Sequence, residues 1–409
     1  MLNWAQQFNI FCFLDNHQYH HTSSTVECLL AVGSIRQLQA PRGEGLDSME
    51  SFLSLEDEWV FGHLGYDLKN EIENLSSSNE DYVQFPDIFL FVPEVVILLR
   101  EENISIGDFN NEADLICKQI LNSSSSIRPS PVSATIKSRF TREEYVDIIK
   151  KLKDHILKGD FYEINFCQEF YDNNIIIDPL STFVSLGKMS PNPYGAFYRL
   201  NDQYLLCESP ERYLKKTQNH IFSQPIKGTW SRDLEDEVRD NENKMSLKQN
   251  QKERSENVMV VDLVRNDLSK ICEEGTVEVV ELFGVYTFPQ VHQLISTVKG
   301  ILLEEIKPVD IIRATFPMGS MTGAPKKRVM EAIEQYERTK RGIFSGAVGY
   351  FTPDGDFDFN VVIRSILYNS ASKYLSYQAG SGITFYCDAE KEYEECLLKV
   401  EVIKKVLTN

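Results

Sequence analysis

The clearest hydrophobic pattern in this 409-residue chain lies between residues 141 and 159. Thr141 and Glu144 have the spacing of a capping box, which marks the start of a helix. Apolar residues then recur at helical spacing, and Gly159 follows as a typical helix end. The apolar positions are Tyr145, Ile148, Ile149, Leu152 and Ile156. The pattern predicts an amphipathic helix across this range.

Short apolar runs rich in β-branched and aromatic residues lie at 59–62, 88–92 and 161–170. Such runs are typical of strands. The run 258–264 fits either a strand or a buried helix. Helices and strands alternate irregularly, without the regular spacing of βαβ repeats. We therefore predict an α+β fold, with large antiparallel β-sheets packed as a sandwich and helices on the outside.

Two polar stretches interrupt this pattern. Residues 122–134 combine a serine run with two prolines, a composition typical of linkers. They divide the chain into an N-terminal region, 1–121, and a larger region, 135–409. Residues 235–250 are mostly polar and lack a continuous apolar stripe. We expect this second stretch, which follows Lys227, to be exposed or mobile, as a lid would be.

Composition narrows the class of protein. A formal net charge of -19 disfavours nucleic acid, whose binding needs a basic surface. The sequence contains no apolar run of about 18 residues, which argues against a membrane span. Its eight cysteines include no C-x-x-C pair, so we expect reduced thiols. These features favour a cytoplasmic protein that binds neither nucleic acid nor membrane.

Two acidic motifs share one spacing. Glu253 and Glu256 lie three positions apart, as do Glu392 and Glu395. Residues three apart share one face of a helix, so each pair can direct two carboxylates at one point. Hard oxygen ligands of this kind suit Mg²⁺. Chance remains an alternative, because 61 acidic residues produce several such pairs.

Three further segments offer sites for an anion. The residues concerned are Ser320, Thr322, Arg364, Gly380 and Gly382. The two hydroxyls precede a helix predicted to start near Pro325, and free N–H groups at a helix start bind anions. We expect Arg364 to lie in an apolar strand, where its buried charge needs a partner. Glycines allow close backbone approach. Taken singly, each also fits a turn glycine or an internal ion pair.

Together these segments resemble the chorismate-utilising enzymes, a family of anthranilate, aminodeoxychorismate, isochorismate and salicylate synthases. The motifs occur in the family's order: K-G-T at 227–229, E-x-x-E-N-x-M-x-V-D-L-x-R-N-D at 253–267, G-S-x-T-G-A-P-K at 319–326, G-A-V-G-Y at 346–350, I-R-S at 363–365, A-G-x-G at 379–382 and E-x-x-E-x-x-x-K at 392–399. The resemblance implies the chorismate-binding enzyme fold, with the catalytic domain at 135–409. Residues 1–121 would form the N-terminal region found in anthranilate synthase component I.

The resemblance also implies a set of binding residues. Mg²⁺ would be held by Glu256 and Glu395, with Glu253 and Glu392 nearby through water, and would bind the ring carboxylate of chorismate. The enolpyruvyl carboxylate would meet Tyr350, Arg364, Gly380 and Gly382. The remaining substrate-binding residues implied are Gly228, Thr229, Ser320, Thr322 and Lys399.

Three residues are implied as catalytic. Glu211 matches the family's general acid, which would protonate the departing C4 hydroxyl and needs a pKa raised by burial. His292 matches a histidine near that hydroxyl, although a lone histidine in an apolar stretch is more often a satisfied core residue. Lys227 stands where members of the family differ and would be the nucleophile.

Lys227 would select the reaction. In the aminodeoxychorismate branch, component I, a lysine here attacks ring C2, and ammonia then adds at C4 to give 4-amino-4-deoxychorismate for 4-aminobenzoate and folate synthesis. The strand region 162–168 contains no lysine to activate water, which disfavours the isochorismate reaction. Two departures from the family pattern stand out: Trp230-Ser231-Arg232 after the K-G-T motif, and Glu163 where amine-adding relatives have glutamine.

The resemblance implies a source of ammonia. It continues almost to residue 409 without a glutaminase-like region, so we expect a separate glutaminase subunit. Two alternatives stay open: anthranilate synthase component I, and a catalytically silent Mg²⁺-binding scaffold subunit.

Overall fold

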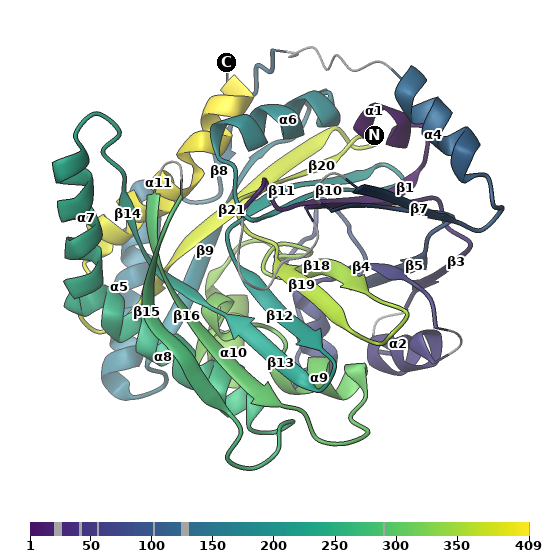
Figure 1. Ribbon diagram of the computed structural model, residues 1–409. Helices are drawn as coiled ribbons and strands as arrows, with labels where there is room; N and C mark the ends of the chain where they lie inside the picture. The colour runs from purple at the N-terminus through teal and green to yellow at the C-terminus, as the bar shows by residue number, and fades with distance from the viewer. Residues whose placement is uncertain are drawn as a thin grey trace.

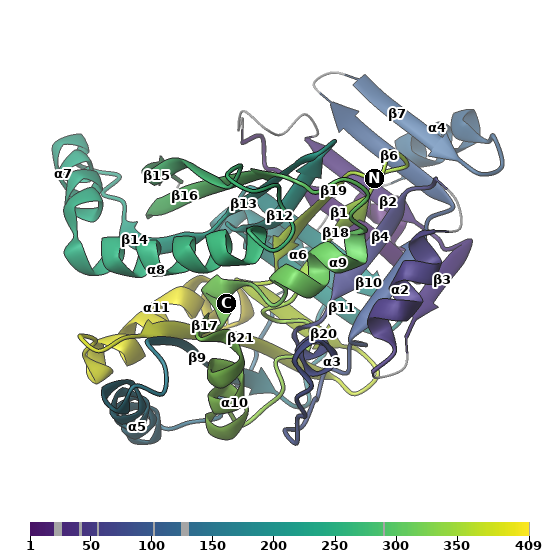
Figure 2. The same ribbon diagram turned by 90° about the horizontal axis from the view of Figure 1, so that it is seen from below.

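The computed structural model describes residues 1–19, 27–40, 43–54, 57–100, 103–123, 131–288 and 291–408. Two large sheets, whose paired strands are antiparallel, form its centre (Figures 1 and 2). Helices lie around them, so the predicted α+β fold is confirmed. Among the described residues, no helix has both the length and the apolar character needed to cross a bilayer.

The larger sheet joins strands from the whole length of the chain. Its order is β17 (Gly323–Ala324), β9 (Glu163–Asp172), β21 (Tyr374–Ile383), β20 (Ser365–Asn369), β11 (Gln203–Ser209), β10 (Tyr194–Leu200), β1 (Ile10–Asp15), β2 (Cys28–Val32), β6 (Val95–Arg100) and β7 (Asn103–Asp108), with β8 (Lys137–Ser138) also paired to β9.

The second sheet is built in the same way. Its order is β14 (Ile226–Ser231), β16 (Val291–Ile301), β13 (His220–Gln224), β12 (Arg212–Thr217), β19 (Phe357–Val361), β18 (Ala347–Phe351), β4 (Val60–Leu64), β5 (Ile88–Val92) and β3 (Arg36–Gln39), with β15 (Glu278–Thr287) also paired to β16.

The helices connect and cover these sheets. They are α1 (Leu2–Ala5), α2 (Gly45–Leu53), α3 (Lys69–Glu73), α4 (Ala113–Asn122), α5 (Arg142–Lys158), α6 (Pro179–Met189), α7 (Glu237–Gln249), α8 (Gln251–Leu268), α9 (Pro308–Thr315), α10 (Lys326–Tyr336) and α11 (Ala389–Thr408), with short 3₁₀ turns η1 (Tyr66–Leu68) and η2 (Gly319–Met321).

Two apolar cores result. The first lies between the sheets, where residues of the larger sheet such as Leu29 and Leu205 share a cluster with Phe61 and Phe359 of the second sheet. The second core lies on the other face of the larger sheet, under α5, α6 and α11. Burial of apolar surface on both faces explains why β9 and β21 are buried along almost their whole length.

Strand pairing crosses the boundary expected between the N-terminal and C-terminal regions. Strand β1 pairs with β10 in one sheet, and β4 pairs with β18 in the other. Residues 1–121 and 135–409 therefore share both sheets and the core between them. Of the expected linker, residues 124–130 lie outside the described part of the chain.

The helix expected at 141–159 is confirmed. In α5, the Thr141 hydroxyl accepts from the Glu144 N–H and the Glu144 carboxylate accepts from the Thr141 N–H, while Gly159 ends the helix with φ 83°. The ambiguous run 258–264 belongs to helix α8. The stretch 235–250 is mostly exposed, as expected, and it forms helix α7. The Asp236 side chain caps this helix, which packs on β14, β15 and β16.

Candidate active site

A cavity of about 360 Å³ opens beside β14, α8, α11 and the ends of β9 and β21. This volume lies within the usual range for small-molecule sites. Twelve of the sixteen residues expected to act at the site line it: Glu211, Lys227, Gly228, Thr229, Glu253, Glu256, Ser320, Arg364, Gly380, Gly382, Glu395 and Lys399. Segments more than 180 residues apart in the sequence therefore meet in one hollow.

Lys227 enters the cavity from an irregular part of β14. The pairing of β14 with β16 shifts register between Ile226 and Thr229, and Gly228 between them has φ 100°. A left-handed conformation of this kind favours glycine. Asn257 of α8 donates from its side-chain amide to the Lys227 carbonyl, at 3.5 Å, so the backbone of the nucleophile candidate is tied to α8.

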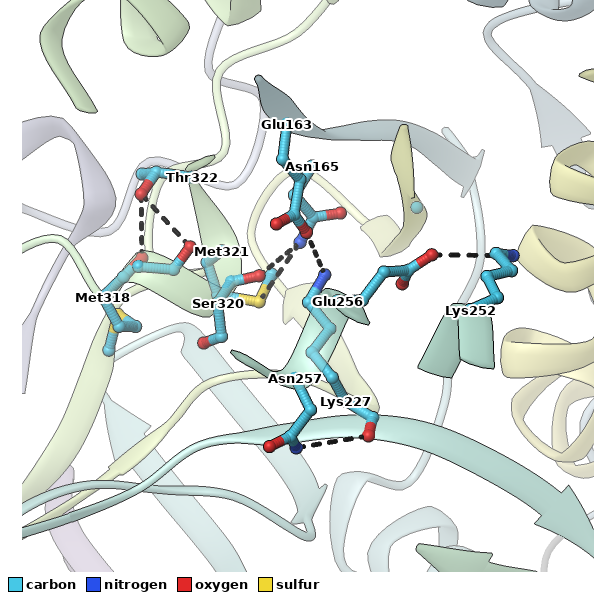
Figure 3. Close-up of polar contacts among 12 residues, drawn as sticks. Glu163, Asn165, Lys227, Lys252, Glu256, Asn257, Met318, Ser320, Met321 and Thr322 are labelled. Atoms are coloured by element: carbon cyan, nitrogen blue, oxygen red, sulfur yellow. Dashed lines mark hydrogen bonds and ion pairs between the residues drawn. The ribbon is translucent and has the colours of Figure 1, made fainter. Parts of the chain in front are cut away.

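The Lys227 amine forms an ion pair with Glu163 of β9, with 2.9 Å between Nζ and Oε1 (Figure 3). Both side chains are almost completely buried. Burial acts to lower the pKa of Lys227, but the carboxylates of Glu163 and Glu256 outweigh it and raise that pKa above its ordinary value. Lys227 is therefore a cation in this arrangement.

Gly382 of β21 makes room for this ion pair. A Cβ atom at position 382 would lie 2.8 Å from Lys227 Nζ and 3.0 Å from Glu163 Oε1. A Cβ atom this close would force the flexible end of the Lys227 side chain to move, so a side chain here would displace the amine. The A-G-x-G motif thus has a steric role beside Lys227.

Glu211 lies at the cavity wall just after β11. Its Oε1 accepts a hydrogen bond of 2.6 Å from the Ser320 hydroxyl of η2. Burial raises the pKa of Glu211 to about 7, against the opposing effects of Ser320 and Lys227. A carboxyl group that titrates near neutrality suits a general acid.

The two acidic motifs face each other from α8 and α11. Burial raises the pKa of Glu256 to about 8 and also raises that of Glu253, whereas Lys399 and other cations lower the pKa of Glu395 to about 2. The ammonium group of Lys252 lies among these carboxylates, 2.9 Å from Glu392 Oε1. The four glutamates thus form one acidic cluster with Lys252 beside it.

The acidic cluster has donors that fit Mg²⁺. Oε1 of Glu256 and Oε2 of Glu392 are buried and accept no hydrogen bond, so their lone pairs are available to a ligand. Carboxylate oxygens are the ligands this ion prefers. In the described part of the chain, however, no three His, Cys, Asp or Glu side chains are already arranged to hold a metal ion. The donor atoms of the cluster are of the kind that binds Mg²⁺, but the carboxylates are not close enough together to hold the ion without moving.

Arg364 and Lys399 add positive charge to the cavity lining, close to Glu395. Arg364 is not part of a strand: it lies between β19 and β20 with φ 54°, and its Nη1 donates to the Lys399 carbonyl at 2.8 Å. Burial lowers the pKa of Arg364 to about 10, although Glu395 opposes this. A buried guanidinium facing a cavity offers a bidentate site for a carboxylate. Lys399 Nζ bonds Glu395 and the Gly380 carbonyl.

The structure does not bring His292 to the cavity. Its ring nitrogens bond Asp240 and Thr287, both at 3.0 Å, on the outer side of β16. Because side chains alternate along a strand, the next residue, Gln293, lines the cavity instead. Oε1 of Gln293 is buried and accepts no hydrogen bond. The alternation rule, applied to 291–295, would have indicated Gln293.

Three other expected residues also lie outside the cavity lining. Thr322 is buried and its hydroxyl donates to the Met318 carbonyl, which stabilises the turn that carries Ser320. Tyr350 packs on Trp59 and lines a separate cavity of about 70 Å³. Glu392 is buried beside Lys252 instead of facing the hollow.

No residue of the helix start at 325–328 lines this cavity. Lys326 Nζ turns away to Asp267 Oδ2 at 2.6 Å and to the Thr315 carbonyl. The lysine of the G-A-P-K motif and the last aspartate of the R-N-D motif thus form a structural ion pair. Asn165 and Gln378, which the sequence did not single out, do line the cavity. Asn165 donates to the Ser320 carbonyl at 3.0 Å.

With the site described, its family can be given. The model of the family described as chorismate binding enzyme matches residues 7–405. The chain therefore belongs to the chorismate-binding enzymes and is an enzyme of that family.

Curated relatives give a finer comparison. The chain is 33% identical to aminodeoxychorismate synthase component 1 of Escherichia coli, over 85% of this chain and 76% of the relative. It is 31% identical to the protein of the same description in Bacillus subtilis, again over 85% and 76%. Aminodeoxychorismate synthase, chloroplastic, of Arabidopsis thaliana is 34% identical over 83% of this chain. The match spans only 39% of that plant relative and 43% of a similar one from rice.

Solved structures support the fold. Anthranilate synthase component I from Streptococcus pneumoniae superposes with a TM-score of 0.82 at 24% identity, over 94% of this chain and 93% of that chain. The menaquinone-specific isochorismate synthase of Escherichia coli gives 0.79 at 16% identity, over 99% and 91%. At such identities the likeness shows the fold and not the reaction.

Proposed function

We propose that the chain aminates chorismate at C4 to give 4-amino-4-deoxychorismate, a step toward 4-aminobenzoate and folate. The observation that carries this proposal is the buried Lys227 amine inside the cavity, 2.9 Å from Glu163. The curated relatives described as aminodeoxychorismate synthase support it.

In the proposed reaction, Lys227 acts as the nucleophile. As a neutral amine, its Nζ forms a bond to ring C2, the diene electrons move toward C4, and the C4–O bond breaks. Glu211 gives its proton to the departing hydroxyl, which leaves as water. Ammonia then forms a bond to C4, and Nζ leaves C2. Lys227 must lose a proton first, and Glu163 Oε1 is its nearest acceptor.

Charged groups of the chain would position the substrate. Arg364 and Lys399 would meet one carboxylate of chorismate. Glu253, Glu256 and Glu395 of the cavity lining, together with the buried Glu392, would hold Mg²⁺. When bound, the ion supplies a positive site for the ring carboxylate, which four glutamates would otherwise repel. We further propose that the ammonia comes from a glutaminase partner, since the bacterial relatives are described as component 1.

Incubation with chorismate, Mg²⁺ and ammonium tests this function. We expect 4-amino-4-deoxychorismate by chromatography, and mass spectrometry of the quenched enzyme should show an adduct on Lys227. Lys227→Ala should lose at least about a thousandfold in kcat, as expected when a nucleophile is removed. The surface variant Lys405→Ala is the matched control. Release of anthranilate with pyruvate would replace this proposal with anthranilate synthase, and absence of chorismate binding by calorimetry would favour a silent scaffold.

A further inference from the structure

Lys252 occupies an unusual place in the acidic cluster. Its Nζ lies 2.9 Å from Glu392 Oε1, 3.7 Å from Glu256 Oε1 and 3.8 Å from Glu395 Oε2. Figure 3 shows the contact between Lys252 and Glu256 as a dashed line. One ammonium group thus contacts carboxylates of both acidic motifs, across α8 and α11.

Local helix chemistry does not explain this placement. Lys252 lies in the first turn of α8, where the helix dipole presents positive charge and acidic residues are favoured. A lysine at that position is locally unfavourable. Its carboxylate partners offset the cost, because Glu392 and Glu256 are buried and need a counter-charge. Its ammonium group lies within 3.8 Å of a carboxylate oxygen from each of three glutamates.

Lys252 supplies a positive charge to the cluster but does not donate a hydrogen bond to every buried carboxylate oxygen. It donates a hydrogen bond to Glu392 Oε1. Oε1 of Glu256 and Oε2 of Glu392 remain buried without a hydrogen bond. An ammonium group has three donors in a compact head, whereas a divalent ion can draw several carboxylates to about 2.1 Å. The free oxygens are therefore better suited to a metal than to the lysine.

We propose that Lys252 is a built-in counter-cation, which holds the acidic cluster in the metal-free enzyme and competes with Mg²⁺ for the same carboxylates. This inference rests on the Mg²⁺ site of the proposed function. The Lys252 side chain is 36% exposed, so its head can withdraw to solvent by rotation of the side chain. Metal entry then exchanges one cation for another at the buried carboxylates.

The competition between Lys252 and Mg²⁺ should be measurable as a change in the apparent Kd for Mg²⁺. If the lysine occupies the cluster in most molecules, the apparent Kd for Mg²⁺ is the intrinsic Kd divided by the fraction of molecules in which the cluster is free. A cluster free in about a tenth of the molecules weakens binding roughly tenfold. Removal of the Lys252 amine should therefore tighten Mg²⁺ binding.

Titration calorimetry with MgCl₂, without chorismate and at fixed ionic strength, tests this. Lys252→Met keeps the length of the side chain and removes its charge. We expect its Kd for Mg²⁺ to be at least about tenfold lower than that of the wild type. Lys405→Met is the matched control: Lys405 also forms an i,i+4 ion pair, with Glu401 on the exposed side of α11, and has the same charge change. It should leave the Kd within about twofold, the scatter expected for an exposed ion pair.

Thermal unfolding gives a second readout. Without metal, Lys252→Met should have a lower Tm than the wild type, and added Mg²⁺ should raise its Tm by more, because ligand binding stabilises the folded state. Lys252→Gln serves if the methionine variant does not fold. Adding Glu256→Gln to Lys252→Met should abolish the gain in affinity, which would place the gain at this cluster.

The outcomes separate the two proposals. An unchanged or weaker affinity in Lys252→Met, with wild-type binding intact, would overturn the role of Lys252 and leave the Mg²⁺ site standing. Absence of Mg²⁺ binding in both proteins would overturn both. Binding in the variant alone would support the competition most strongly.

Discussion

Glu211 and Lys227 line the same cavity but have opposite requirements for catalysis: one must carry a proton and the other must lose one. Burial raises the pKa of Glu211 to about 7, which keeps the group largely protonated below neutrality. Around Lys227, the carboxylates of Glu163 and Glu256 have the stronger effect and favour the protonated amine. At the scale of single residues, Glu211 can carry the proton that a general acid needs, whereas Lys227 carries a proton that a nucleophile must lose.

The hydrogen bond from Ser320 to Glu211 gives the first prediction. If Glu211 is the acid, kcat falls as pH rises through about 7. The Ser320 hydroxyl stabilises the ionised carboxylate and so lowers the pKa of Glu211. Ser320→Ala should therefore raise that pKa and move the alkaline limb of the kcat profile to higher pH. Ser269→Ala, at an exposed helix end, is the control. An unmoved limb would show that another group sets it.

Glu163 gives the second prediction, because it is the nearest acceptor for the Lys227 proton. Glu163→Gln keeps the shape and removes the base. We expect kcat at neutral pH to fall by at least about 100-fold relative to the wild type, as for loss of a general base. The ratio between the two kcat values should shrink as pH rises and solvent takes the proton. A variant at least as fast as the wild type at every pH would mean that Glu163 only raises the pKa of Lys227.

At the scale of elements, strand β16 shows why some site residues were misplaced. The sequence identified the segment 288–292 but assigned the role to His292, whereas the strand turns Gln293 toward the cavity. Helix α5 was predicted closely because its capping box and apolar spacing are local features. The contacts of Glu163 with Lys227 and of Lys252 with Glu392 join segments 64 and 140 residues apart, which local patterns do not encode.

Helix α7 supplies the third prediction. Its residues are largely polar, and only Asp240 and Leu247 are buried. This carboxylate accepts from Arg232 Nε at 2.9 Å, from the Asp233 N–H and from His292 Nε2. Asp240→Ala should therefore increase amide hydrogen exchange across 237–249, while exchange in α8 stays unchanged. Equal protection in both proteins would show that α7 is held by other contacts.

At the scale of the whole molecule, the acidic surface and the cavity fit together. A chain with a net charge of -19 repels an anionic substrate, so the cations must be local. Lys227, Arg364 and Lys399 are placed around the cavity by β14, by the turn before β20 and by α11. The family motifs identified most of these residues from the sequence. Their arrangement follows from two sheets whose strands come from all parts of the chain.

This shared architecture gives the last prediction. Removal of residues 1–121 would leave β10 and β18 without their partners β1 and β4 and would open the core between the sheets. Unpaired strand edges and exposed apolar surface favour aggregation over folding. We expect the full chain to unfold in one cooperative calorimetric transition, and the fragment 135–409 to lack a cooperative transition and to bind a hydrophobic dye. Coexpression with 1–121 should restore the transition. A fragment that melts cooperatively at the temperature of the full chain would instead show that 135–409 is an independent domain.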